Sequence, residues 1–191
     1  MKTEELWKNV STNFKSVIDL REKIETASDS FKKEPGVYRL WVKEGPSLDI
    51  LKGLDCQNMA DKLLQKNIQG TDFLAMYFGM SKNTFGRLKW HMLQKHNAKT
   101  VKNGTISTLR HTLSAILFKG KGLTSTKDKL DKWMDENCFF EWGYTPDKSR
   151  AADIEKDEIS RNIYPLNIQG NKRISKDLRN QLIDLRKKVN F

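Results

Sequence analysis

The sequence predicts an α+β fold in which a small mixed sheet is covered by helices. Only three short segments have the apolar character of buried strands, at residues 35–42, 73–79 and 138–145. Around them, apolar residues recur at the spacing of one helix face. The expected order is helix, strand, strand, three helices, strand and two helices. So few strands among so many helices favour a small sheet with helical cover.

The first third of the chain is expected to begin with a helix over residues 3–24. Its apolar residues fall at helical spacing, namely Leu6, Val10, Phe14, Val17 and Leu20. A polar break at 29–35 precedes the first strand, and the segment EGPSLD at 44–49 predicts a turn. A short helix at about 57–67 is expected before the second strand.

The rest of the chain is predicted to be mostly helical. Ser81 or Asn83 is expected to cap a helix that runs to about residue 96, and a basic loop follows at 97–104. Further helices are expected at 107–118, 126–137 and 148–163, the last ended by Pro165. Ser175 is expected to cap a final amphipathic helix.

The charge of the chain suggests a polyanionic partner. Lys and Arg exceed Asp and Glu by 35 − 24 = 11, and the sequence pI is about 9.6. Such a surplus attracts nucleic acid, although a merely lysine-rich, solvated surface has the same composition. Cys56 and Cys138 are too few and too far apart for a disulfide framework or a zinc site. With no signal peptide and no apolar run of about 20 residues, the expected compartment is the cytoplasm, without a membrane partner.

Six polar side chains are expected to lie near one another in this plan: Tyr38, Tyr77, Arg87, His91, Glu155 and Asn167. The two tyrosines lie on adjacent apolar strands, where a buried phenol needs a partner. Arg87 and His91 are four residues apart and project from one helix face. On a helical wheel, Glu155 falls within the inward arc and Glu158 near its edge. The inward arc also holds Ala151, Ala152, Ile154 and Ile159.

These residue types suit the cleavage of a phosphodiester. A carboxylate can hold a hard divalent cation such as Mg²⁺. The cation and an arginine would stabilise the charge that develops on the phosphate. A tyrosine or a histidine could take a proton from the attacking water.

The motifs around these residues resemble those of the GIY-YIG nucleases. Gly36-Val37-Tyr38 and Tyr77-Phe78-Gly79 resemble the two signature tripeptides of that family. The pattern Y-F-G-x-S-x-N-x-x-x-R-L-x-x-H from Tyr77 to His91 resembles its second strand and catalytic helix. The pattern I-E-x-x-x-I from Ile154, followed by P-L-N at 165–167, resembles its metal-binding helix and closing asparagine.

This resemblance implies a three-stranded antiparallel sheet flanked by helices, and a DNA endonuclease that uses one divalent metal ion. Glu155 would hold the metal, Mg²⁺ or Mn²⁺. Tyr38, with help from Tyr77 or His91, would activate water. Arg87 would bind the phosphate, and Asn167 would brace the site.

The expected organisation is an N-terminal helical extension at 1–34, a nuclease domain at 35–171 and a C-terminal amphipathic helix at 172–191. The domain departs from the family pattern by insertions at about 44–70 and 97–137, which could carry DNA contacts or a dimer interface. Five lysines are candidate phosphate contacts, or simply solubilising: Lys95, Lys99, Lys102, Lys119 and Lys121.

Plainer interpretations stay open for each of the residues. The tyrosines could be core residues, the Arg87 and His91 pair a solvated face, and Asn167 a turn residue. Glu155 could pair with a lysine or an arginine. For the whole chain, the alternatives are a nucleic-acid-binding module that does not cut and a structural interaction protein. Restriction, mobile-element and repair nucleases all use this catalytic core, so the motifs leave the biological role open, although no segment predicts the base reader that restriction requires.

Overall fold

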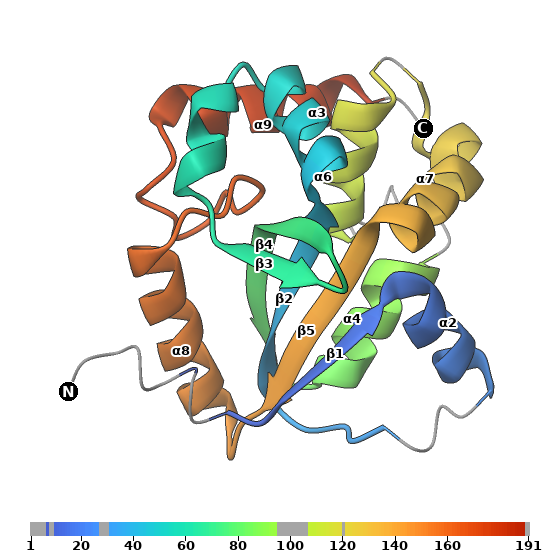
Figure 1. Ribbon diagram of the computed structural model, residues 1–191, viewed down its shortest axis with the longest axis vertical. Coiled ribbons are helices and arrows are strands. Elements are labelled where there is room, and N and C mark those ends of the chain that lie inside the picture. The colour runs from blue at the N-terminus through green and yellow to red at the C-terminus, as the bar shows by residue number, and fades with distance from the viewer. Residues whose placement is uncertain (1–6, 8–9, 27–30, 95–106, 120, 190–191) are drawn as a thin grey trace.

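The computed structural model describes residues 7, 10–26, 31–94, 107–119 and 121–189, with only the backbone at 123. Its centre is an antiparallel sheet of five strands in the order β1-β5-β2-β4-β3 (Figure 1). The strands are β1 (Thr12–Ser16), β2 (Gly36–Lys43), β3 (Gln65–Ile68), β4 (Thr71–Ser81) and β5 (Cys138–Tyr144). The α+β class is therefore confirmed, but the predicted three strands are only the central three of five.

The first missed strand is β1, which was predicted to be part of a helix over 3–24. The helix of this region is α2 (Val17–Thr26), and the preceding residues pair with the outer edge of β5. Phe14 stacks on Phe139 of β5, with ring centroids 5.1 Å apart. An apolar side chain such as Phe14 fits a strand as well as a helix face. The segment forms a strand because the edge of β5 is available for pairing. The helical extension predicted at 1–34 therefore contains a strand of the sheet.

The second missed strand is β3, which forms a hairpin with β4. The predicted helix at 57–67 is instead a 3-10 helix, η2 (Gln57–Lys62), followed by this strand. Gln69 and Gly70, between the strands, have φ values of 51° and 82°. Two consecutive residues with positive φ are typical of the tight hairpin turn, whose twist matches that of the strands.

The turn predicted at 44–49 is also wrong, because these residues begin the helix α3 (Glu44–Gly53). Pro46 lies in the first turn of this helix, where a missing N–H breaks no hydrogen bond. Proline and glycine in this segment therefore mark a helix start rather than a turn.

The remaining helices agree with the sequence expectations: α4 (Thr84–Leu93), α6 (Thr108–Leu117), α7 (Leu123–Asn137), α8 (Lys148–Arg161) and α9 (Lys176–Lys188). Asn83, not Ser81, caps α4, because its side chain accepts a hydrogen bond from the Gly86 N–H. Ser175 caps α9 as predicted. α4 ends at Leu93, with Gln94 as its C-cap, and so is shorter than the predicted helix to about residue 96. The basic loop predicted at 97–104 lies outside the described residues.

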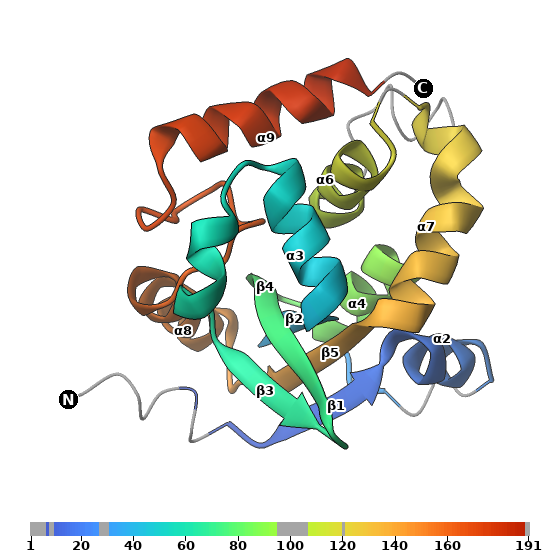
Figure 2. The ribbon, with the colours of Figure 1, turned by 45° about the horizontal axis from the view of Figure 1, so that its top comes forward.

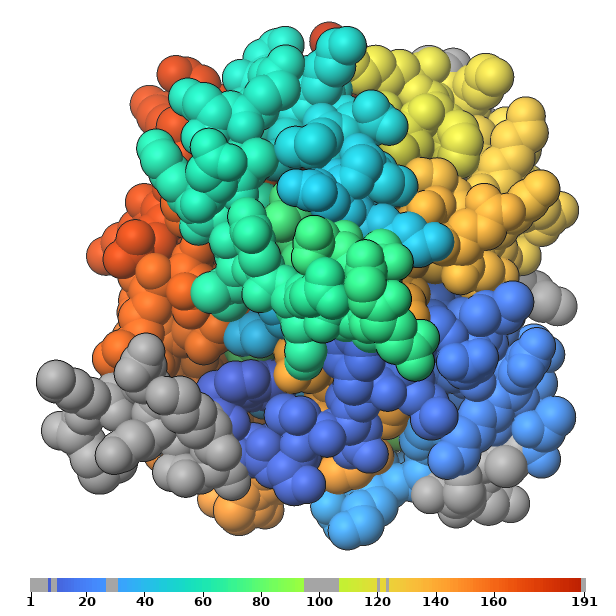
Figure 3. Space-filling model, viewed as in Figure 1, coloured from blue at the N-terminus to red at the C-terminus, as the bar shows by residue number. Residues whose placement is uncertain are grey.

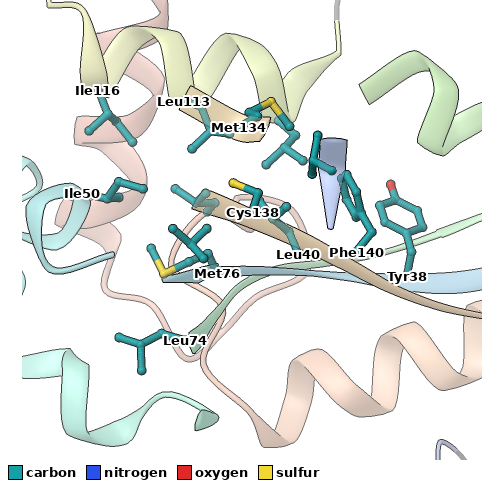
Figure 4. Close-up of a cluster of buried hydrophobic side chains, with 14 of the residues drawn as sticks. Tyr38, Leu40, Ile50, Leu74, Met76, Leu113, Ile116, Met134, Cys138 and Phe140 are labelled. Carbon is teal, nitrogen blue, oxygen red and sulfur yellow. The ribbon is translucent and has the colours of Figure 1, made fainter. Parts of the chain in front are cut away.

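Helices cover both faces of the sheet. One face carries α8, and the other carries α2, α3, α4, α6, α7 and α9 (Figures 1 and 2). On the more heavily covered face, Leu40, Met76 and Phe140 from the three central strands pack against Leu113 and Met134 from α6 and α7 (Figure 4). On the exterior seen in Figure 3, the surface of α3 and β3 lies directly above that of β1 and α2. None of the helices among the described residues is long and apolar enough to cross a membrane.

Candidate active site

The two signature glycines are required by close approaches between strands. Tyr38 on β2 pairs with Gly79 on β4, and its ring crosses over that residue. A Cβ atom at position 79 would lie 2.7 Å from the Tyr38 hydroxyl oxygen, which no real side chain tolerates. A Cβ atom at Gly36 would collide with the carbonyl oxygen of Gly143 on β5. Gly79 thus leaves room for the Tyr38 phenol over β4, and Gly36 lets β2 approach β5 closely.

The hydroxyl of Tyr38 bonds to the helix that follows β4. In Figure 4, Tyr38 stands at one end of the core cluster beside Phe140. Its hydroxyl is 2.9 Å from Nε2 of His91, on the inner face of α4. The Tyr77 ring lies close to both, at 6.1 Å from the Tyr38 ring and 6.2 Å from the His91 ring. The structure therefore brings together these three predicted residues.

Ser107 is a member of this hydrogen-bonded chain that the sequence did not reveal. Its hydroxyl caps α6 by accepting from the Arg110 N–H, and it lies 2.6 Å from Nδ1 of His91. The imidazole therefore has hydrogen-bonding partners at both nitrogens. Ser107 follows the undescribed part of the predicted insertion at 97–137, so the start of α6 orients a residue of the signature motif. In the sequence, a single serine at the start of a helix gives no sign that it contacts His91.

Arg110 caps the C-terminal end of α4, the helix that carries His91. This fully buried guanidinium donates to the carbonyl oxygens of His91 and Met92, at 3.1 Å each, and pairs with Asp131 of α7. The last carbonyl groups of a helix have no partner within it, so a buried cation is a stabilising cap. The helices α6 and α7 thus hold α4 in place against the sheet.

Burial keeps both Tyr38 and His91 uncharged. Desolvation lowers the pKa of His91 to about 3, and the positive charges of Arg87 and Arg110 act in the same direction. Desolvation also raises the pKa of Tyr38 well above 10, aided by Tyr77 and partly opposed by Arg87. Near neutral pH the pair is therefore a neutral phenol and a neutral imidazole.

Arg87 provides positive charge that no carboxylate neutralises. Its guanidinium lies over the ring of Trp90, 4.5 Å from the centroid, and forms no ion pair within the described parts of the chain. Desolvation raises the pKa of Tyr77, and the charge of Glu155 acts likewise, whereas Arg87 opposes both. Arg87 is therefore close enough to act on the tyrosines and still has donors available to an anion.

Glu155 faces the site from α8. One of its carboxylate oxygens accepts the Met80 N–H at 3.0 Å, and the other has no hydrogen-bond partner among the residues that the structure describes. Burial raises its pKa above 4.5, opposed by that N–H group and by Arg87. The expected alternative, an ion pair with a lysine or an arginine, is not observed for Glu155 within these residues.

Glu158, one turn further along α8, is the carboxylate that forms such a pair. It bonds to Arg39 at 2.6 Å and accepts the hydroxyl of Tyr164, on the face of the sheet opposite Tyr38. It is buried, whereas Ala152, which was predicted to face inward, is exposed. The helical wheel therefore misjudged the buried face of α8, because Glu158 is more deeply buried than Glu155. The choice of Glu155 for the site rests on the resemblance of its motif and not on the wheel.

Asn167 bonds to the edge of β4 beyond the part that pairs with β3. Its side chain accepts the Phe78 N–H at 2.8 Å and donates to the Phe78 carbonyl oxygen at 2.6 Å. The neighbouring Leu166 N–H donates to the Met76 carbonyl oxygen, and Glu155 accepts the Met80 N–H. Three alternate residues at this edge are thus bonded without a further strand. The predicted bracing role of Asn167 has a structural basis in this contact.

Two hollows lie beside these residues. A cavity of about 790 Å³ is bounded by Tyr77, Glu155 and Asn167 on one side and by α9 on the other. A shallower hollow of about 460 Å³ lies next to Arg87 and contains Lys82, Trp90 and Lys148. Both are lined by more cationic than acidic side chains, as a path for a polyanion requires.

The cations at these hollows differ from the lysines that the sequence suggested. Lys95, Lys99 and Lys102 lie outside the described residues. Lys119 donates to the Gly53 carbonyl oxygen, and neither it nor the exposed Lys121 lines either hollow. Besides Arg87, the cations that line the hollows are Lys82, Lys148, Lys156, Arg179 and Arg186. The two arginines flank the apolar stripe of α9 at a spacing of seven, which is a signal the sequence does contain.

A metal ion would have one protein ligand here. Among the described residues, no three His, Cys, Asp or Glu side chains gather as a metal cage would require. Mg²⁺ does not need one, because it retains several waters and is often bound through one carboxylate and the phosphates of a substrate. The free oxygen of Glu155, next to a hollow that admits water, fits this mode of binding.

Comparison with protein families matches residues 36–188 to the GIY-YIG catalytic domain. The chain therefore belongs to the GIY-YIG nuclease family. No curated protein and no solved structure matches it. The match includes the segments predicted to be insertions and most of the predicted C-terminal helix, while the domain limits stay a prediction.

Proposed function

We propose that this protein is a divalent-metal-dependent DNA endonuclease that hydrolyses phosphodiester bonds. The observation that supports this most strongly is the convergence of side chains from four separate elements. Tyr77 from β4 and Glu155 from α8 line a cationic cavity, and Tyr38 from β2 and His91 from α4 lie buried against the Tyr77 ring. Arg87 from α4 lines the neighbouring hollow. If the signature residues only stabilised the core, we would not expect Arg87 without an ion-pair partner, or Glu155 with one carboxylate oxygen unbonded, among the described residues.

The buried hydrogen bond between Tyr38 and His91 suits the activation of water. A neutral phenol oxygen can accept a proton from water as its own proton moves toward a neutral imidazole nitrogen. His91 begins this step neutral because burial lowers its pKa, and Ser107 fixes the ring orientation. Since the same burial disfavours the imidazolium that results, the negative charge of the bound phosphate would have to stabilise it. Tyr77, at the edge of the cavity, would position the water or the phosphate next to the pair.

Arg87 and Glu155 would act on the phosphate. The guanidinium of Arg87 can donate two parallel hydrogen bonds to phosphate oxygens and so stabilise the charge that develops on them. Glu155 would hold Mg²⁺ or Mn²⁺, which when bound supplies further stabilisation of that charge. Asn167 would act indirectly, by keeping the edge of β4 and therefore Tyr77 in place.

The proposal is tested by incubating the purified protein with supercoiled plasmid and with flap, branched and single-stranded DNA, with Mg²⁺ or with EDTA. We expect cleavage that requires the metal ion and that is lost in Glu155→Ala and in Arg87→Ala. Matched controls remove exposed charges from the same two helices, with Asp153→Ala on α8 and Lys89→Ala on α4. Both controls should retain cleavage.

Two results would contradict the proposal. Full activity in Glu155→Ala and Arg87→Ala would show that these residues do not form the active site. Salt-sensitive DNA binding without cleavage for any metal or substrate would instead identify a binding module of the same fold. The substrates that are cut would also separate the biological roles, because discrete plasmid fragments indicate restriction and selective cutting of flaps indicates repair.

A further inference from the structure

The cavity of about 790 Å³ extends well beyond the residues needed to cut a phosphodiester. Its walls come from α8, from the segment at 166–170 and from α9, and it shares Tyr77 and Glu155 with the candidate active site. Figure 2 shows α8 and α9 on either side of the segment that joins them. Its volume lies within the usual range of small-molecule sites, about 300–1,000 Å³.

The α9 wall alternates cationic and apolar side chains. Arg179, Ile183 and Arg186 line the cavity at positions i, i+4 and i+7 of this helix. Such positions lie along one face, so the two guanidinium groups start from points about 10 Å apart with the isoleucine between them. The opposite side is mixed: Ile159, Leu166 and Ile168 lie there among the polar side chains of Glu155, Lys156, Asn167 and Gln169.

The two arginines are incompletely satisfied. Arg179 donates through Nη2 to the Asn171 carbonyl oxygen, while its buried Nε has no acceptor among the described residues. Arg186 is half-buried and forms no ion pair within the same residues. Burial lowers the pKa of Arg186, whereas the neighbouring Tyr77 acts in the opposite direction. A cation in this state gains from an anionic partner, because the cost of its desolvation is already met.

We propose that this cavity is a nucleotide subsite, which takes the nucleotide next to the cleaved phosphodiester out of the base stack. Arg186 would bind a phosphate of that nucleotide, Arg179 would bind the next phosphate, and Ile183 and Tyr77 would contact the sugar and the base. The inference rests on the proposed endonuclease function and adds the substrate form to it.

The chemistry of the walls favours a nucleotide over a simple anion. Two cations alone would suit inorganic phosphate, but the half-buried side chains of Ile183, between them, and Ile168, opposite them, would then stay in contact with water. A base has an apolar face that can stack on an aromatic ring such as Tyr77. Since a base inside a duplex is covered on both faces by its neighbours, only an unstacked one can enter this cavity. Unpaired or distorted DNA would therefore bind more favourably than a regular duplex.

The subsite is tested with the full chain and three probes: deoxyadenosine 5′-monophosphate, inorganic phosphate and deoxyadenosine. Binding is followed by amide chemical shifts in NMR titrations. We expect saturable shifts at the cavity residues for the nucleotide, with weaker binding of phosphate and of the nucleoside. Arg186→Gln should weaken nucleotide binding at least about tenfold, as the loss of a charge-assisted hydrogen bond implies.

Two further variants separate the cavity from general surface charge. Ile183→Trp fills the cavity and should abolish nucleotide binding; Ile168→Trp, from the opposite wall, serves if the first variant does not fold. Lys187→Gln is the matched control on α9, because Lys187 is 73% exposed and does not line the cavity. It should bind the nucleotide as the unaltered protein does.

Three outcomes would overturn the subsite: no saturable binding, equal binding of phosphate and nucleotide, or binding unaffected by Arg186→Gln. Cleavage of plasmid and flap DNA is measured in the same preparations. Cleavage without nucleotide binding would refute the subsite alone. Nucleotide binding without any cleavage would refute the endonuclease function and leave only a nucleotide-binding cavity, without the place next to a cleaved bond.

Discussion

The His91→Gln variant is expected to remove a large part of the acid sensitivity of folding. His91 is 2% exposed, and its pKa falls from 6.5 to about 3 in the folded chain. Because the unfolded chain takes up this proton first, stability decreases as the pH falls below 6.5 and continues to decrease down to about 3. The glutamine is neutral at every pH and retains hydrogen-bonding groups.

The size of the effect follows from the two pKa values. At pH 5 almost all unfolded chains have the proton on His91 and almost no folded chains do, so the difference amounts to about 2 kcal/mol relative to pH 8. Other groups also titrate over this interval, and burial of Glu155, for example, acts with the opposite sign. Comparing the two proteins at both pH values cancels such contributions.

The assay is urea unfolding at pH 8 and at pH 5, followed by tryptophan fluorescence. The unaltered protein should lose about 2 kcal/mol more unfolding free energy between these pH values than His91→Gln does. His111→Gln is the matched control on α6, because His111 is only half-buried. Desolvation and the charge of Arg186 lower its pKa, while the hydrogen bond to the Arg186 carbonyl oxygen opposes them. Equal pH dependence in the unaltered protein and His91→Gln would refute the buried, neutral imidazole and with it the proposed proton acceptor.

Two further substitutions test how the sheet positions the site. Gly79→Ala places a methyl group against the Tyr38 hydroxyl, so it should displace the phenol and lower the unfolding free energy by about 1–3 kcal/mol. Gly45→Ala is the control and should cost nothing, because no atom lies within 4 Å of its new methyl group. If Gly79→Ala is as stable as this control, the close approach is disproved. Asn167→Ala leaves the Phe78 N–H and carbonyl groups without partners and should cost about 2–5 kcal/mol by urea unfolding. Asn137→Ala removes a single bond on α7 and should cost about 1 kcal/mol, so similar losses in both would contradict the bracing role of Asn167.

The central strands and most helices could be predicted because their patterns are local. A buried strand such as β2 is apolar on both faces wherever it lies, and the caps Asn83 and Ser175 depend only on residues three positions away. The edge strands could not be predicted in the same way. The residues of β1 are compatible with helix and strand alike, and pairing with a partner more than a hundred residues away determines the outcome.

The same distinction holds for the candidate site. Order and spacing in the sequence, together with the resemblance of the motifs, predicted the candidate set of Tyr38, Tyr77, Arg87, His91, Glu155 and Asn167. Helical spacing alone did not choose Glu155 over Glu158. Spacing in the sequence did not predict which residue each of these side chains contacts. Only the folded chain shows that Ser107 contacts His91, that Glu158 forms an ion pair with Arg39 and that α9 lines the cavity.

By itself, therefore, the sequence determined the family, the polar set and the chemistry that this set suits. The tertiary structure decided which of these groups are charged, which remain available to a substrate, and what surrounds them. The physical reason is that desolvation, ion pairing and cavity shape depend on contacts between residues far apart in the chain. The lowered pKa of His91, the half-free carboxylate of Glu155 and the arginines beside Tyr77 all arise from such contacts.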